Sequence, residues 1–122
     1  MRTTLFGSVV LTAIVAASAC NDNPVSCTAQ SVPAVAVTVR DSLTNALAGR
    51  GARIVARDGA FADTARATTT YDGPYDLAPE RSGTYTVTVE QQGYRVWSQQ
   101  GVSVGRDKCH LRTATLTARL QR

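Results

Sequence analysis

The chain has 122 residues, with 13 lysines and arginines, 9 acidic residues and 1 histidine. This length allows one small domain. Because the chain has a single histidine, it cannot form a metal site or an acid/base site that requires two histidines of one chain. With 43% hydrophobic residues, the chain is too apolar for an intrinsically disordered protein. Its basic residues are scattered beside acidic ones rather than clustered, so we expect no nucleic-acid partner.

The first 19 residues have the features of a secretory signal peptide. Arg2 lies near the start, an apolar run extends from Leu5 to Ala17, and small residues follow. As a helix this run would span about 20 Å. That is too short for a bilayer core of about 30 Å. The segment therefore predicts export rather than a transmembrane helix.

The end of this segment, Ala17-Ser18-Ala19-Cys20, is similar to a bacterial lipobox. In a lipobox the cysteine is lipid-modified and becomes the new N-terminus, although Ala17 stands where the pattern prefers leucine. Simple secretion with cleavage after Ala19 remains the alternative. We expect a signal peptide over residues 1–19, a lipid anchor at Cys20 with a tether to residue 31, and a domain over residues 32–122. The expected location is a bacterial membrane, on its periplasmic face or at the cell surface.

The remaining cysteines predict a disulfide bond. If Cys20 carries lipid, Cys27 and Cys109 are an even pair in an oxidising compartment, where disulfide bonds persist. A zinc site built from Cys27, Cys109 and His110 would lack a fourth ligand. We therefore expect no metal and no cofactor. His110 is expected on a strand as an exposed surface residue.

From Val32 onward, apolar and polar residues alternate with the period of two that is typical of β-strands. The clearest strand is expected over residues 84–90, with Tyr85, Val87 and Val89 on one face. Further strands are expected over residues 35–40, 52–57, 60–70, 75–77, 94–97, 101–104 and 109–120. A change of parity in the last of these predicts a bulge or a bend near Arg112-Thr113. The pattern indicates an all-β, antiparallel sandwich of seven or eight strands, with the disulfide bond joining the first and last strands as an edge pair.

Three segments carry a resemblance to a known family. They are Val37-Thr38-Val39-Arg40-Asp41 followed by Leu47-Ala48-Gly49-Arg50-Gly51-Ala52, then Asp72-Gly73-Pro74-Tyr75-Asp76-Leu77, and finally Gly83-Thr84-Tyr85-Thr86-Val87-Thr88-Val89 with Gly93-Tyr94. Over residues 35–120 the chain resembles the bacterial carboxypeptidase regulatory-like domain. The resemblance implies an immunoglobulin/transthyretin-like sandwich without catalytic activity, which acts as a structural or protein-interaction module of the cell envelope. The expected partners are the membrane, through the lipid, and an envelope protein or a glycan.

Glycan binding is the alternative function. The candidate ligand contacts are the aromatic residues Trp97, Tyr94, Tyr71 and Tyr75. Trp97 has the opposite parity to Tyr94, so one of the two side chains points outward if the strand is regular. An outward Trp97 would be a platform for sugar rings, whereas a bend in the strand would turn it onto the core. The chain contains no Gly-x-Ser-x-Gly motif, and we expect no enzyme.

Overall fold

The computed structural model describes residues 27–122. These residues form seven strands and no helix: β1 (Pro33–Asp41), β2 (Arg53–Asp58), β3 (Phe61–Arg66), β4 (Tyr75–Pro79), β5 (Gly83–Glu90), β6 (Trp97–Val104) and β7 (Ala114–Leu120). No helix of this region could therefore cross a membrane. The predicted signal peptide and the predicted lipidation site, Cys20, lie outside the described residues.

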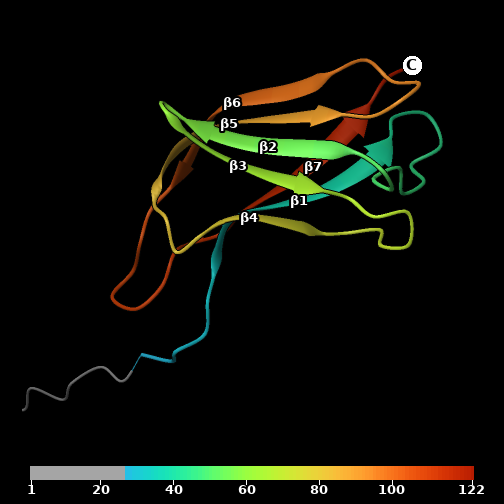
Figure 1. Ribbon diagram of the computed structural model, residues 1–122. Helices are drawn as coiled ribbons and strands as arrows, with labels where there is room; N and C mark the ends of the chain where they lie inside the picture. The colour runs from blue at the N-terminus through green and yellow to red at the C-terminus, as the bar shows by residue number, and fades with distance from the viewer. Residues whose placement is uncertain (1–26) are drawn as a thin grey trace, which may run out of the picture.

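The strands form two sheets that face each other as layers (Figure 1). One sheet has three strands in the order β4-β1-β7, and the other has four in the order β3-β2-β5-β6. The predicted all-β sandwich is confirmed, with seven strands. β1 and β2 belong to different sheets, as do β3 and β4, so the chain crosses between the layers several times.

The core lies between the two sheets and follows from the alternation in the sequence. Tyr85, Val87 and Val89 of β5 are fully buried, as predicted, and the threonines between them are not. In the opposing sheet, alternate residues of β1 face this layer. The largest fully buried side chains are Tyr85, Ile54, Leu77, Leu120, Val35, Val37, Val39, Val87 and Val89.

The main irregularity of the strands lies in β6 rather than in the last strand. Tyr85 pairs with Val102, whereas Val87 pairs with Gln99, so β6 contains one extra residue. Gly101 adopts a φ of 67° at this point, a left-handed conformation that a glycine bulge requires. Of the two strands predicted here, residues 101–104 lie within β6. The strand predicted over residues 94–97 is wrong apart from Trp97, at which β6 begins. Near Arg112-Thr113 the structure has no bulge within a strand. The expected strand over residues 109–120 is interrupted there, and β7 begins only at Ala114.

One strand pair is parallel. β1 pairs with β4 in antiparallel fashion but with β7 in parallel, from Val35 opposite Ala114 to Asp41 opposite Leu120. The other four strand pairs within residues 27–122 are antiparallel, so the predicted antiparallel sandwich is confirmed apart from this pair. β1 is also the central strand of its sheet, so the first and last strands are not an edge pair.

The predicted disulfide bond between Cys27 and Cys109 is confirmed. The two Cα atoms lie 5.2 Å apart, and 82 positions separate the residues in the sequence. The bond fastens the segment before β1 to the turn before β7. Close by, the backbone N–H of Glu80 donates to the carbonyl oxygen of Val32. These contacts fix the point at which the N-terminal tether leaves the sandwich.

The two ends of the sandwich differ. The tether leaves at one end, beside the turns 59–60, 80–82 and 105–113, which we call the tether end (Figure 1). The loops 42–52, 67–74 and 91–96 gather with the C-terminus at the other end, which we call the loop end (Figure 1).

Candidate interaction surface at the loop end

Exposed apolar side chains gather at the loop end. Among the described residues, the large hydrophobic side chains that are exposed are those of Leu43, Leu47, Tyr71 and Val96. They come from all three loops of this end, and none comes from the tether end. Since isolated exposed apolar residues normally occur anywhere on a surface, their restriction to one end marks that end as a candidate binding surface.

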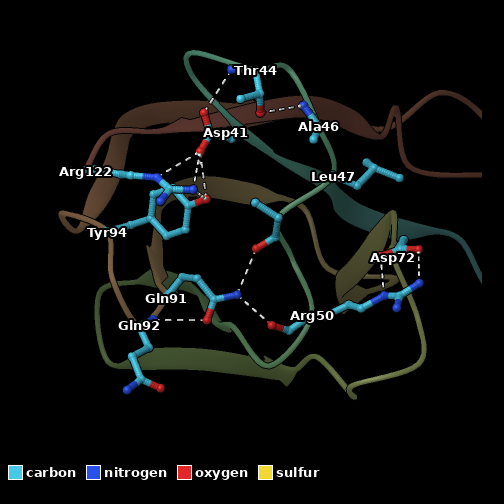
Figure 2. A pocket seen from close by; sticks show the side chains of 11 residues that line it. Asp41, Thr44, Ala46, Leu47, Arg50, Asp72, Gln91, Gln92, Tyr94 and Arg122 are labelled. Atoms are coloured by element: carbon cyan, nitrogen blue, oxygen red, sulfur yellow. Dashed lines mark hydrogen bonds and ion pairs between the residues drawn. The ribbon is translucent and has the colours of Figure 1, made fainter.

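A hollow of about 700 Å³ opens between these loops (Figure 2). Its lining includes Leu47 and Arg50 from the first loop, Asp72 from the second, and Gln91 and Tyr94 from the third. Arg122 at the chain end completes it. The hollow is therefore built by segments that are far apart in the sequence and meet only in the fold.

Asp41 fixes one side of the hollow (Figure 2). Its Oδ1 accepts hydrogen bonds from the backbone N–H groups of Leu43 (2.8 Å) and Thr44 (3.0 Å). Its Oδ2 accepts from the Tyr94 hydroxyl at 2.8 Å and from Arg122 Nη2 at 3.2 Å. These hydrogen bonds, led by that of Thr44, hold the pKa of Asp41 well below its usual value. The carboxylate therefore ties two loops to the C-terminus.

Arg50 and Gln91 fix the other side. The Arg50 guanidinium donates from Nε and Nη2 to the two carboxylate oxygens of Asp72, each at 2.7 Å. The Gln91 amide donates to the carbonyl oxygens of Ala48 at 2.8 Å and Arg50 at 2.6 Å. Each charged side chain of the lining thus has an oppositely charged partner within it. This arrangement offers fixed polar contacts for a ligand rather than an unpaired acid or base.

The predicted aromatic contacts do not form one platform. Tyr75 is only 5% exposed, and its hydroxyl donates to the Tyr71 carbonyl oxygen at 2.7 Å. The prediction that Tyr75 contacts a ligand is therefore wrong, because Gly49, lacking a Cβ, lets the Tyr75 ring pack against its backbone. Tyr71 itself is 51% exposed and meets the Tyr75 ring edge to face, with the ring centroids 5.6 Å apart.

Tyr94 and Trp97 line two different hollows of the surface. Tyr94 lines the hollow, but its hydroxyl is bonded to Asp41 and the Arg122 guanidinium lies 5.2 Å from its ring centroid. Trp97 is half-buried and packs against the core. It lines a second, smaller groove of about 370 Å³, together with Arg95 and Arg119. The bend that turns Trp97 inward is therefore present.

His110 lies in the turn before β7, half-buried, so its predicted place on a strand as an exposed residue is wrong. Its Nε2 lies 2.9 Å from the Thr28 hydroxyl, and its buried Nδ1 has no hydrogen-bond partner. Asp107 Oδ1 accepts from the backbone N–H groups of Cys109 and His110, and these bonds lower the pKa of Asp107. No group of three or more potential metal ligands occurs within residues 27–122.

Several residues of this surface were not singled out from the sequence. Gln91 and Arg122 carry no motif, and Asp41 was noted only as the last residue of a segment that resembles the family. The proximity of the three residues depends on the strand register. The signal available was the position of Asp41 directly after an alternating strand, where aspartate often caps a turn.

Comparison with known proteins agrees with the resemblance seen in the sequence. Residues 34–121 match the family model described as Carboxypeptidase regulatory-like domain. The match covers all seven strands apart from the first residue of β1. No curated protein and no solved structure matches the chain.

Proposed function

Because the chain belongs to the carboxypeptidase regulatory-like domain family, a family of non-catalytic domains, we propose that it works by contact alone. In this proposal it is an interaction domain of the bacterial cell envelope, held to a membrane by lipid on Cys20, with an envelope protein as its partner. The loop end is the surface that meets the partner.

The single observation that carries the proposal is the distribution of exposed apolar side chains. Leu43 is 85% exposed and Val96 is 64% exposed, and they belong to loops 42–52 and 91–96 of the loop end. Interfaces are enriched in tyrosine and arginine around apolar centres, and Tyr71 and Arg50 supply these types here. A domain tethered at one end would hold this surface away from its membrane.

The length of the tether supports the same arrangement. Residues 21–26 separate Cys20 from the disulfide-bonded Cys27 and span at most about 20 Å when extended. The tether end would therefore stay near the membrane surface. A lipid anchor of more than one chain would hold it there stably.

The contacts of the aromatic residues favour a protein over a glycan as partner. A sugar platform needs an open ring face. The Tyr94 ring carries the Arg122 guanidinium, and Trp97 packs partly on the core. Sugar binding through Trp97 and Tyr94 would require both contacts to open.

A comparative capture experiment tests the proposal. The full chain, cross-linked in envelope preparations, is compared with the double variant Leu43→Ser/Leu47→Ser and with Ala62→Ser. Ala62 is an exposed residue near the tether end and is the matched control. We expect one or more specific adducts to be lost in the double variant and kept in the control. Equal adducts in all three chains would overturn the assignment of the loop end.

The anchor is tested separately. Replacement of Cys20→Ser should move the protein from the membrane fraction to the aqueous fraction, and intact mass should lose the lipid increment. Release of wild type into the aqueous fraction would contradict the anchored state while leaving the loop-end proposal open to its own test.

A further inference from the structure

The sandwich has two flanks, one formed by the outer strands β3 and β4 and the other by the outer strands β6 and β7. Different contacts join the outer strands on the two flanks. On one flank, β3 and β4 are joined by Asp63, whose Oδ2 accepts from the backbone N–H of Ala78 at 2.7 Å. Arg81 adds to this closure, because its guanidinium lies 4.0 Å from the Phe61 ring centroid. Exposed strand edges are a liability, and these two side-chain contacts bridge the edges of this flank.

The other flank is bridged by a backbone hydrogen bond. β6 and β7 are the outer strands of their sheets, so each has one edge without a strand partner. At the loop end, the Arg95 backbone N–H donates to the Gln121 carbonyl oxygen at 2.7 Å and joins the two edges. Beside this bond lies the groove of about 370 Å³, lined by Arg95, Val96, Trp97, Ser98, Arg119 and Gln121.

The groove carries positive charge without acidic partners. Five ion pairs occur within residues 27–122, and neither Arg95 nor Arg119 belongs to one. Arg119 donates to the neutral side-chain oxygen of Asn45 at 2.8 Å. Both arginines are exposed, so their guanidinium groups are available to an external anion.

A third arginine increases the local charge. Arg40 of β1 stands directly opposite Arg119 of β7 in the parallel pair. Like charges placed opposite each other in a sheet are destabilising. Arg40 also lacks an ion pair among the described residues and donates to the Asn45 carbonyl oxygen at 2.8 Å. An anion held near these side chains would relieve their repulsion.

We propose that this groove binds an extended acidic segment of the partner protein. A glutamate or aspartate carboxylate is held by Arg95 and Arg119, and a neighbouring apolar side chain packs on Val96 and the exposed part of Trp97. The backbone of the segment bonds to the free strand edges, a common mode of peptide recognition. Bidentate guanidinium–carboxylate bonds supply the charge contact. The inference rests on the proposed function and names the chemistry of its partner.

The same features disfavour other occupants. A second copy would bring its own Arg95 and Arg119 to the flank, and the chain has a net charge of +4. Nucleic acid and lipid headgroups supply anions. Neither of these ligands, however, has both the peptide backbone that would pair with a strand edge and an apolar side chain that would pack on Val96 and Trp97.

A peptide-binding measurement tests the inference. The full chain in neutral detergent is titrated with a fluorescent hexapeptide of alternating glutamate and valine, and anisotropy is recorded. The matched peptide has glutamine in place of glutamate. We expect the acidic peptide to bind, the glutamine peptide to bind about tenfold more weakly, and the difference to disappear at high salt.

Variants locate the site. Arg95→Gln/Arg119→Gln should weaken binding of the acidic peptide about tenfold. The control is Arg57→Gln/Arg66→Gln, because Arg57 and Arg66 are also exposed and without ion pairs but lie in β2 and β3. Thermal melting confirms that both variants fold.

Three outcomes would overturn the inference: no binding of the acidic peptide, equal weakening in both double variants, or stronger competition by an oligo-uronate or by vesicles of anionic lipid. Dimerisation through this flank in sedimentation would do the same. If the peptide fails while Leu43→Ser/Leu47→Ser still abolishes capture, the proposed function stands and only the groove assignment falls.

Discussion

Removal of the disulfide bond is the most informative perturbation of stability. The bond joins residues that are 82 positions apart, so it closes most of the described chain into one loop. The change is Cys27→Ser together with Cys109→Ser, made in a Cys20→Ser background so that no third thiol can exchange. Only the restriction on the unfolded chain and the contacts of the two sulfur atoms are lost.

The magnitude follows from the loop length. In the chain-entropy estimate, closing a loop of this size stabilises the folded state by about 4–5 kcal/mol. Small domains have unfolding free energies of about 5–15 kcal/mol, so the loss is a large share of the total. For a domain of about 100 residues, each kcal/mol lowers Tm by roughly 4–8 °C, which gives a decrease of about 15–40 °C.

Urea unfolding at equilibrium measures the effect. The double variant should lose about 3–5 kcal/mol and show a larger dependence of the free energy on urea, because its unfolded chain exposes more surface. Wild type reduced with a thiol reagent should behave like the variant. If the double variant lost less than about 1 kcal/mol of unfolding free energy, the reasoning would be refuted, because closing a loop of this length would then contribute little to stability.

Three further predictions concern the packing and the loop end. Gly49→Ala should lower the free energy of unfolding by about 1–3 kcal/mol in chemical denaturation, because its Cβ would lie 2.6 Å from the Tyr75 ring; an unchanged value would contradict this packing. Gly101→Val should cost about 1–2 kcal/mol from its left-handed φ alone, since no atom lies within 4 Å of the added Cβ; a stabilised variant would contradict the bulge. The low pKa of Asp41 contributes stability that is present above the ordinary carboxyl pKa and lost as the pH falls toward its folded value. Asp41→Asn should therefore be less stable than wild type at neutral pH, with a gap that narrows on acidification; a constant gap would count against the assigned hydrogen bonds.

The sequence predicted β5 and the core well because period-two alternation directly reports which side chains face inward. The sequence also identified the disulfide pair, because Cys27 and Cys109 are the two cysteines that remain when Cys20 is set aside as the expected lipid site. Asn45 adopts a φ of 60°, a left-handed conformation that asparagine tolerates better than most residues. Each of these features is local in the chain or depends on residue type alone.

The remaining features depend on which strands lie side by side. The β6 bulge at Gly101 shifts the alternation by one residue, so residues 98–100 were not recognised as part of the strand that contains residues 101–104. Alternation does not show whether a neighbour is parallel, so the β1–β7 pair was missed, and with it the adjacency of Arg40 and Arg119. The burial of Tyr75 likewise depends on Gly49, which lies 26 positions away in a different loop.

Site-specific photo-cross-linking in living cells tests most directly whether the domain acts by contact through its loop end. A photoreactive residue at position 43, which is 85% exposed, is compared with the same residue at position 62. The account predicts a discrete protein adduct from position 43 and none from position 62. Adducts of equal yield from both positions, or none from position 43 under conditions in which the protein is anchored, would contradict it.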